Sequence, residues 1–307
     1  MGESAMNEAP RSWRLKLWRL LKTFGWLILL VLIAQQVWWA PFRADAARAR
    51  VIERFQQERK SRVIAMIHRQ DTQSLFGVPV SQSITIDDSE AILRAIRLTQ
   101  PEQPLDLILH TPGGLVLAAE QIAKALVEHK GKVTVFVPHY AMSGGTLIAL
   151  TADEIVMDPN AVLGPVDPQI GGLPAASILK LVELKKPAQV SDEMLVLADM
   201  AAKARLQVAA FVAEVLLKHH PKDRAAALAL VLSEGRWTHD FPITVQAARQ
   251  LGIPVSVNMP PIIYELMDLY PQGRAGRPSV LYVPIRRDRD SPREFGGSPP
   301  PRAPAEK

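Results

Sequence analysis

The 307-residue sequence contains no cysteine. This absence excludes disulfides, thiolate zinc sites and a cysteine nucleophile, so any nucleophile must be an oxygen or a nitrogen. The sequence also lacks a G-x-G-x-x-G at the start of a helix, and no histidine pair has the spacing or the acidic companion of a metal site. We therefore expect neither a dinucleotide, nor a metal, nor any other cofactor.

An excess of basic over acidic residues is confined to the first 62 residues. Residues 1–62 hold twelve Lys/Arg against five Asp/Glu, whereas the rest of the chain holds 24 against 26. A nucleic-acid-binding domain would carry a basic face with aromatic platforms between the charges, and neither is visible. We therefore expect no nucleic-acid partner. The 48% hydrophobic content is sufficient for a large buried core.

The basic excess flanks an uncharged run from Phe24 to Phe42. This run is long enough to cross a bilayer as one helix, with Trp38 and Trp39 at an interface. Five basic residues precede it: Arg11, Arg14, Lys16, Arg19 and Lys22. By the positive-inside rule we expect a single-pass signal anchor in the cell membrane, with the amino terminus in the cytoplasm and the domain outside.

Two rivals to the anchor remain open for this segment. The expected topology is weakened by a second basic group on the far side, Arg43, Arg48 and Arg50. Residues 44–46 resemble a small-x-small cleavage site, which would make the run a removable signal peptide. The segment could also lie flat in the interface, because apolar residues gather on one side with basic residues between them. These apolar residues are Trp13, Leu17, Leu20, Phe24 and Leu27.

The chain divides into five parts by composition. They are a basic segment (1–22), the transmembrane anchor (23–42), a helical stalk or linker (43–61), an α/β domain (62–285) and a tail rich in Pro, Arg, Asp and Gly (286–307). We expect the tail to be disordered, because it has almost no large apolar residues.

Within the domain, short apolar runs alternate with helical patterns, which is typical of a mostly parallel sheet. We expect strands at 62–67, 105–110, 132–138, 155–157, 161–166 and 279–284. We expect helices at 88–99, 116–128, 224–232, 244–251 and 262–269, and a long helix with an apolar face from Leu197 to Val215. Asp87 or Asp88 should cap the first of them.

A serine stands at one strand-to-helix turn. Ser143 follows the apolar run 133–137 and precedes Gly144 and Gly145, which let the backbone bend sharply beside the unpaired amides of a helix start. A second glycine turn, Gly113-Gly114, follows the run 105–109 and could supply amides for an oxyanion. Either turn alone fits an ordinary tight turn. Together they favour Ser143 as an activated nucleophile.

Three blocks carry a family resemblance: LILHTPGGLVLAAEQIAKAL, VFVPHYAMSGGTLIALTADEIVMDPNAVLGPVDPQ and GRWTHDFPIT. They resemble the serine dehydrogenase proteinase family, a branch of the Clp-like serine proteases that also includes signal peptide peptidase A and the NfeD-type membrane-bound proteases. The resemblance covers about residues 62–269. It implies a Clp/crotonase fold of stacked ββα units, Ser143 as nucleophile, oxyanion amides around Gly113, Gly114 and Gly144, peptide or protein substrates, and a homo-oligomer.

A serine hydroxyl needs a base within hydrogen-bond reach. The Clp subunits use a histidine in the strand after the serine, but residues 163–169 contain none. The membrane-bound relatives use a lysine, and Lys203 matches its position best, at the edge of an apolar helix face where burial could lower its pKa. Lys185 and Lys186 are closer to the signal peptide peptidase pattern but lie in a polar stretch. His239, beside Asp240, is the third candidate.

We therefore predict a membrane-anchored serine endopeptidase that cleaves membrane-proximal peptides, in which Ser143 attacks and Lys203 accepts its proton. Two other functions remain open. The same glycine turn would serve a crotonase-like acyl-CoA enzyme, against which the membrane segment and the serine argue. An inactive membrane scaffold is the third reading, because no base is certain.

Overall fold

The computed structural model describes residues 18, 22, 24–26, 43–68, 73–75, 78–80 and 83–270. Apart from residues 24–26, the expected anchor at 23–42 lies outside this part of the chain. The tail and the strand expected at 279–284 lie outside it as well. No helix in the described ranges has the length and apolar character needed to cross a membrane.

The centre of the fold is a five-stranded, all-parallel sheet in the order β1-β4-β5-β7-β12. Its strands are β1 (Arg62–Ile67), β4 (Leu105–His110), β5 (Val133–Val137), β7 (Glu154–Met157) and β12 (Val255–Ser256). Every residue of β4 and β5 is buried. These central strands are mostly apolar because both faces of a parallel sheet are covered.

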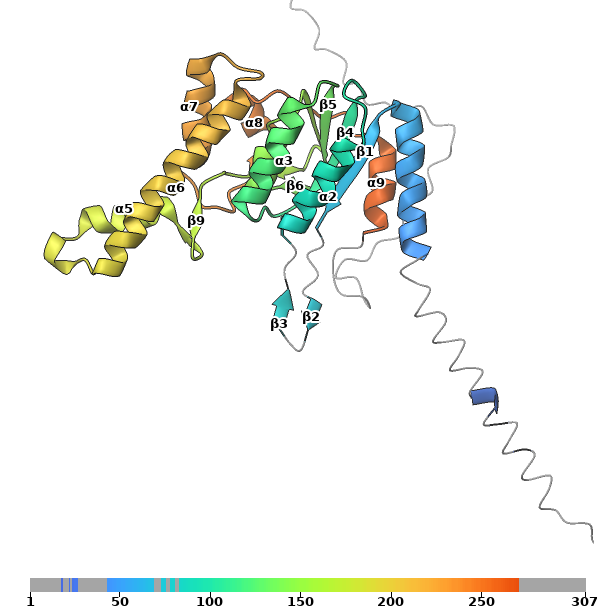
Figure 1. Cartoon of the computed structure of the whole chain (residues 1–307), viewed down its shortest axis with the longest axis horizontal. Helices are drawn as coiled ribbons and strands as arrows, with labels where there is room; N and C mark the ends of the chain where they lie inside the picture. The colour runs from blue at the N-terminus through green and yellow to red at the C-terminus, as the bar shows by residue number, and fades with distance from the viewer. Residues whose placement is uncertain are drawn as a thin grey trace, which may run out of the picture.

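Alternate strand residues feed two separate cores. Leu107 and Leu109 face the core formed with α2 (Ile86–Arg97), α3 (Val116–Glu128) and α4 (Gly144–Ala149). Ile108 and Phe136 face the opposite core, formed with α9 (Pro261–Asp268) and a helix of residues 43–59. Figure 1 shows these last two helices side by side along one edge of the domain.

A second, smaller sheet lies beside the first. It contains β6 (Tyr140–Ala141), β8 (Val162–Leu163) and β11 (Ile243–Thr244), in the order β11-β8-β6. β5, β6 and α4 therefore form one unit of two strands, one in each sheet, followed by a helix. This is the expected ββα arrangement, and the α/β fold with a mostly parallel sheet is confirmed.

The remaining elements include a helical arm. α5 (Ala175–Leu184), the 3-10 turn η1 (Pro187–Gln189) and the first half of α6 (Asp192–Leu216) extend away from the sheet (Figure 1). The second half of α6 returns to the core through Val208, Val212 and Val215. α7 (Lys222–Ser233), α8 (Val245–Leu251) and the hairpins β2 (Gln73–Leu75)–β3 (Val78–Val80) and β9 (Gln169–Ile170)–β10 (Leu173–Pro174) complete the described part.

The start of α2 differs from the sequence expectation. Its N-cap is Thr85, and the expected cap residue Asp88 occupies the third helical position instead. The amide of Thr85 donates to the Asp88 carboxylate (2.8 Å), while the amide of Asp88 donates to the Thr85 hydroxyl (3.4 Å). This reciprocal capping box satisfies two donors that a lone aspartate cap would leave partly unmet.

The expected stalk is helical but is not a free linker. Val51 and Phe55, on the helix of residues 43–59, are buried against Phe136 and α9. At its end, Arg59 bonds both carboxylate oxygens of Asp106 (2.5 and 3.0 Å), whose side chain is 1% exposed. The helical character expected for this segment is present, but the helix belongs to the folded domain, because its apolar side completes the second core.

We predict that Arg59→Ala lowers the free energy of unfolding by about 3 kcal/mol, because it leaves the buried Asp106 carboxylate without its cationic partner. Urea titration followed by circular dichroism would measure the change. Arg54→Ala is the matched control: Arg54 lies on the same helix and pairs with Glu265, where both side chains are about half exposed. Equal losses for the two variants would contradict the assignment of the buried pair as the stabilising contact.

Candidate active site

Ser143 has an unusual backbone conformation. It is the N-cap of α4 at φ 52° and ψ −118°, a region that side-chain-bearing residues rarely adopt. Neighbouring hydrogen bonds hold it there: the amide of Met142 donates to the carbonyl of Thr111 (3.0 Å), and the amide of Gly145 donates to the carbonyl of Met142 (2.7 Å). Strain of this kind concentrates at functional sites, where the surrounding structure enforces it.

The two glycines after Ser143 allow a close approach between segments. A Cβ on Gly145 would lie 2.5 Å from Cγ2 of Thr111, and one on Gly144 would lie 2.9 Å from Cβ of Ala119 on α3. Neither distance is compatible with a side chain. The start of α4 is therefore packed directly onto the turn that follows β4.

That turn presents the candidate oxyanion amides. The amide of Gly113 donates to the Thr111 hydroxyl (3.2 Å) and is therefore engaged. Within the described residues, the amides of Gly114 and Gly144 have no acceptor, and a Cβ on Gly144 would lie 3.9 Å from the Gly114 nitrogen. Of the three glycines that the sequence nominated, Gly114 and Gly144 thus present adjacent free donors beside Ser143.

Two buried histidines, His68 and His110, lie beside this turn. Nδ1 of the buried His68 lies 2.7 Å from the Thr111 hydroxyl, which also accepts the Gly113 amide. Burial lowers the pKa of His68, opposed by nearby Asp88. Burial, with smaller contributions from His139 and His68, lowers the pKa of His110 to about 4. His110 therefore stays neutral at physiological pH and packs as an aromatic ring against Tyr140.

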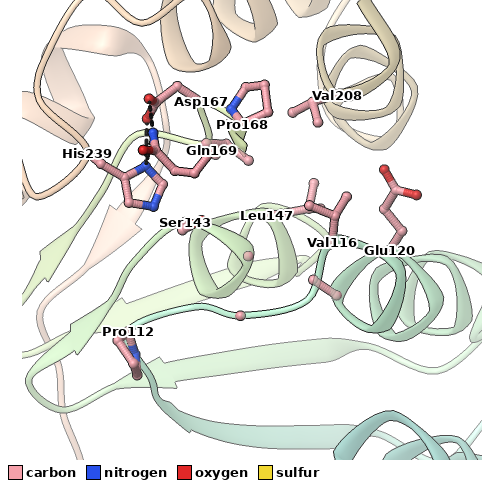
Figure 2. Close-up of a pocket in the computed structure, with 14 residues that line it drawn as sticks. Pro112, Val116, Glu120, Ser143, Leu147, Asp167, Pro168, Gln169, Val208 and His239 are labelled. Atoms are coloured by element: carbon pink, nitrogen blue, oxygen red, sulfur yellow. Dashed lines mark hydrogen bonds and ion pairs between the residues drawn. The ribbon is translucent and has the colours of Figure 1, made fainter. Parts of the chain in front are cut away.

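His239 is paired with an aspartate from a distant part of the chain. Its Nδ1 lies 2.8 Å from Oδ1 of Asp167, which is 3% exposed, while the Gln169 amide donates to Oδ2 of the same carboxylate (2.7 Å). An Nδ1–H bonded to Asp167 leaves Nε2 as the acceptor nitrogen. Figure 2 shows the imidazole above Ser143, with its second nitrogen on the Ser143 side.

The register of the small sheet explains this pairing. β11 runs antiparallel to β8, with Ile243 opposite Leu163. Asp167 lies four residues after Leu163 and His239 lies four residues before Ile243, so the antiparallel pair brings both to the same end of the sheet. Asp240, the partner that the sequence suggested for His239, is exposed.

Ser143, His239 and Asp167 line one cavity of about 220 Å³, which we call the active-site cavity. Its wall comes from the Gly114 turn, the first turns of α3, the start of α4, the segment after β8, and α6 (Figure 2). The lining residues are Pro112, Gly114, Val116, Ala119, Glu120, Ser143, Gly144, Leu147, Val166, Asp167, Pro168, Gln169, Val208 and His239.

No lysine in the described ranges lines this cavity. The Lys203 side chain is 66% exposed and forms an ion pair with Asp199, one turn earlier on α6. Lys185, the C-cap of α5, and Lys186 are also exposed, on the helical arm. The structure therefore brings His239, and none of the three nominated lysines, to Ser143.

Sequence reasoning missed Asp167 and Gln169. Both belong to the stretch 163–169, which contains no histidine but has an aspartate at position 167. The signal was available in that stretch, but only the pairing of β8 with β11 shows which histidine it serves.

A model of the ClpP-like SDH-type serine proteinase family matches residues 16–294. The chain belongs to this family. Its resemblance to the Clp-like serine proteases is thereby confirmed, and the enzyme is a serine peptidase.

Similar proteins include two from Methanocaldococcus jannaschii. MJ1495 is 56% identical over 238 residues, which cover 78% of this chain and 81% of that protein. MJ0137 is 52% identical over 264 residues, which cover 82% and 92%. Among solved structures, a mutant of the 1510-N membrane-bound stomatin-specific protease is similar with 21% identity and a TM-score of 0.41, over 61% of this chain and 79% of that one.

We predict that Gly114→Ala slows fluorophosphonate labelling of the enzyme roughly a hundredfold or more, as loss of an oxyanion donor does elsewhere. The reason is steric: the new Cβ would lie 2.3 Å from the Ile84 nitrogen, so the turn must shift. Gly171→Ala is the control, because Gly171 also has a positive φ (57°) but its Cβ would meet open space in the β9–β10 hairpin, so the variant has backbone strain without the clash. Labelling of Gly114→Ala at the parent rate would exclude this turn from the oxyanion site.

Proposed function

We propose that this serine peptidase is a membrane-anchored endopeptidase in which Ser143 is the nucleophile and His239, held by Asp167, is the general base. The observation that supports the proposal is the His239–Asp167 hydrogen bond of 2.8 Å at the wall of the cavity that also contains Ser143. A nucleophile, a base and a group that orients the base are the three parts that serine acyl transfer requires.

In this mechanism His239 takes the proton of the Ser143 hydroxyl as its oxygen attacks the peptide carbonyl. The tetrahedral oxyanion accepts hydrogen bonds from the Gly114 and Gly144 amides. Asp167 remains ionised and stabilises the imidazolium, which then gives its proton to the leaving amine. Water, deprotonated by the same imidazole, releases the acyl group from Ser143 and restores the free enzyme.

The environment of Lys203 argues against the Ser-Lys dyad that the sequence favoured. A lysine becomes a base near neutral pH when burial lowers its pKa. Lys203 is mostly in solvent and forms an ion pair with Asp199, so it lacks the burial that this role requires. Family membership also favours peptide hydrolysis over the acyl-CoA chemistry considered from sequence.

The fold supports a substrate close to the membrane. The helix of residues 43–59 runs opposite to β1: Arg59 lies at the amino ends of β4 and β5, beside Asp106 and Thr134. Arg48 is near the other end of this helix and lies beside Tyr270. Tyr270 lines a surface cleft together with His68, which follows β1. Residue 43 therefore lies at the sheet end that carries Ser143, immediately after the apolar run 24–42. An anchor formed by that run would place the active-site end nearest the bilayer.

We predict that Ser143→Ala abolishes fluorophosphonate labelling and peptide cleavage, and that His239→Ala lowers cleavage roughly a thousandfold or more. Lys203→Ala, Lys185→Ala and Lys186→Ala should retain activity. Circular dichroism of each variant confirms folding.

Two results would reject this assignment in different ways. An inactive but folded Lys203→Ala beside an active His239→Ala would restore the Ser-Lys dyad. A folded parent enzyme that neither reacts with the probe nor cleaves any peptide would favour the inactive scaffold.

We predict that removal of residues 1–42 releases a soluble, active domain, because Val51 and Phe55, the residues before β1 that complete the second core, are retained. In the full chain, protease added to intact cells should digest the domain and spare the amino terminus, as the positive-inside rule requires. Protection in intact cells, with digestion only in inverted vesicles, would show that Arg43, Arg48 and Arg50 set the opposite topology.

A further inference from the structure

We propose that Glu120 makes the far end of the active-site cavity a subsite for a Lys or Arg side chain, carried by the substrate residue whose carbonyl Ser143 attacks. This inference rests on the proposed function, since it assigns the substrate preference of the same site.

Glu120 occupies the cavity wall opposite the catalytic pair. Val116, Ala119 and Glu120 lie three and four residues apart on α3, so one face of this helix contributes all three to the cavity. Figure 2 shows the Glu120 carboxylate across the cavity from His239, beyond Leu147 and Val116. The side chain of the substrate residue whose carbonyl lies at Ser143 would thus extend along this wall.

The charges in the cavity favour a cation. Glu120, Asp167 and His239 are its ionisable residues, and no arginine or lysine of the described chain lines it. The Asp167 carboxylate is already occupied by His239 and Gln169. Glu120 forms no hydrogen bond or ion pair with any other residue in the described ranges, and partial burial raises its pKa. A substrate cation would supply the partner that this carboxylate lacks.

The rest of the wall fits the stem of a long basic side chain. Val116, Leu147 and Val208 are aliphatic, and they stand between the catalytic end and Glu120 (Figure 2). Lysine and arginine place methylenes on apolar surface and a charge at the tip, which matches this order. The cavity of about 220 Å³ is smaller than sites for drug-sized ligands, roughly 300–1,000 Å³, and suits a single side chain.

Other side chains fit this wall less well. A leucine of similar length would cover the Glu120 carboxylate without giving it a hydrogen bond, which costs the full desolvation of that group. A glutamate would add repulsion between like charges. The order of preference is therefore Lys or Arg first, an uncharged aliphatic side chain next, and Glu last.

The test uses the full-length enzyme and fluorogenic peptides that differ only in the residue before the scissile bond: Lys, Arg, norleucine or Glu. We expect kcat/KM to be highest for Lys and Arg. Glu120→Gln, which keeps the size and removes the charge, should lower kcat/KM for the Lys peptide roughly tenfold or more. It should not lower kcat/KM for the norleucine peptide, which no longer covers a charged carboxylate. Glu128→Gln is the matched control, at the exposed end of the same helix.

Charge reversal gives a second arm. Glu120→Lys should favour the Glu peptide over the Lys peptide. The rate of fluorophosphonate labelling at Ser143, measured for each variant, shows that the catalytic end remains intact. A second peptide series with the lysine moved one or two positions away tests which substrate residue enters the cavity.

Equal kcat/KM for Lys and norleucine peptides in the parent enzyme would overturn the proposal, as would an equal loss for both peptides in Glu120→Gln. A lysine preference found only at another peptide position would overturn the assignment to the attacked residue. These outcomes differ from failure of the proposed function, in which the parent enzyme neither reacts with the probe nor cleaves any peptide.

Discussion

The contact between the Gly113-Gly114 turn and the start of α4 is the constraint on which the rest of the site depends. A Cβ on Gly113 would lie 2.7 Å from Cβ of Ser143, so the two segments meet with no space for another side chain. This contact holds Ser143 at a positive φ and brings the Gly114 and Gly144 amides together. The remaining parts of the site, the acid–base pair and the cavity wall, are arranged around a nucleophile whose direction is already fixed.

The parts of the fold with strong local signals were predictable from sequence. β4 and α3 have the expected bounds, because an apolar run and a helical period that ends before a glycine are both local patterns. The Ser143 turn was predictable for the same reason. Asp167 and His239 are 72 residues apart and meet through β8 and β11, each two residues long. Strands of two residues are too short to show an alternating pattern, so the sequence could not predict that Asp167 and His239 meet.

The position of Lys203 shows a second limit. Its neighbours on α6 have the spacing of a buried apolar face, which suggested partial burial. That spacing says which side of a helix is apolar, but not on which side a residue at the edge of the apolar face lies. α5 covers Leu197 and Ala201 on the apolar side of α6. Lys203 lies on the other side, where Val196, Met200 and Leu206 are exposed as well. Burial of a side chain on the helical arm is a tertiary property.

The packing of residues 43–59 onto the sheet restricts how an anchored enzyme could search for substrates. A flexible tether would let the domain tumble and sweep a volume of solution. Residues 43–59 are fixed along the domain through Phe55, Arg48 and Arg59, so they add no flexible length between the expected anchor and the domain. Encounters of an anchored domain with substrate would then depend on lateral diffusion in two dimensions. The rate of cleavage would depend on how often a polypeptide emerges beside the enzyme rather than on the bulk concentration of that polypeptide.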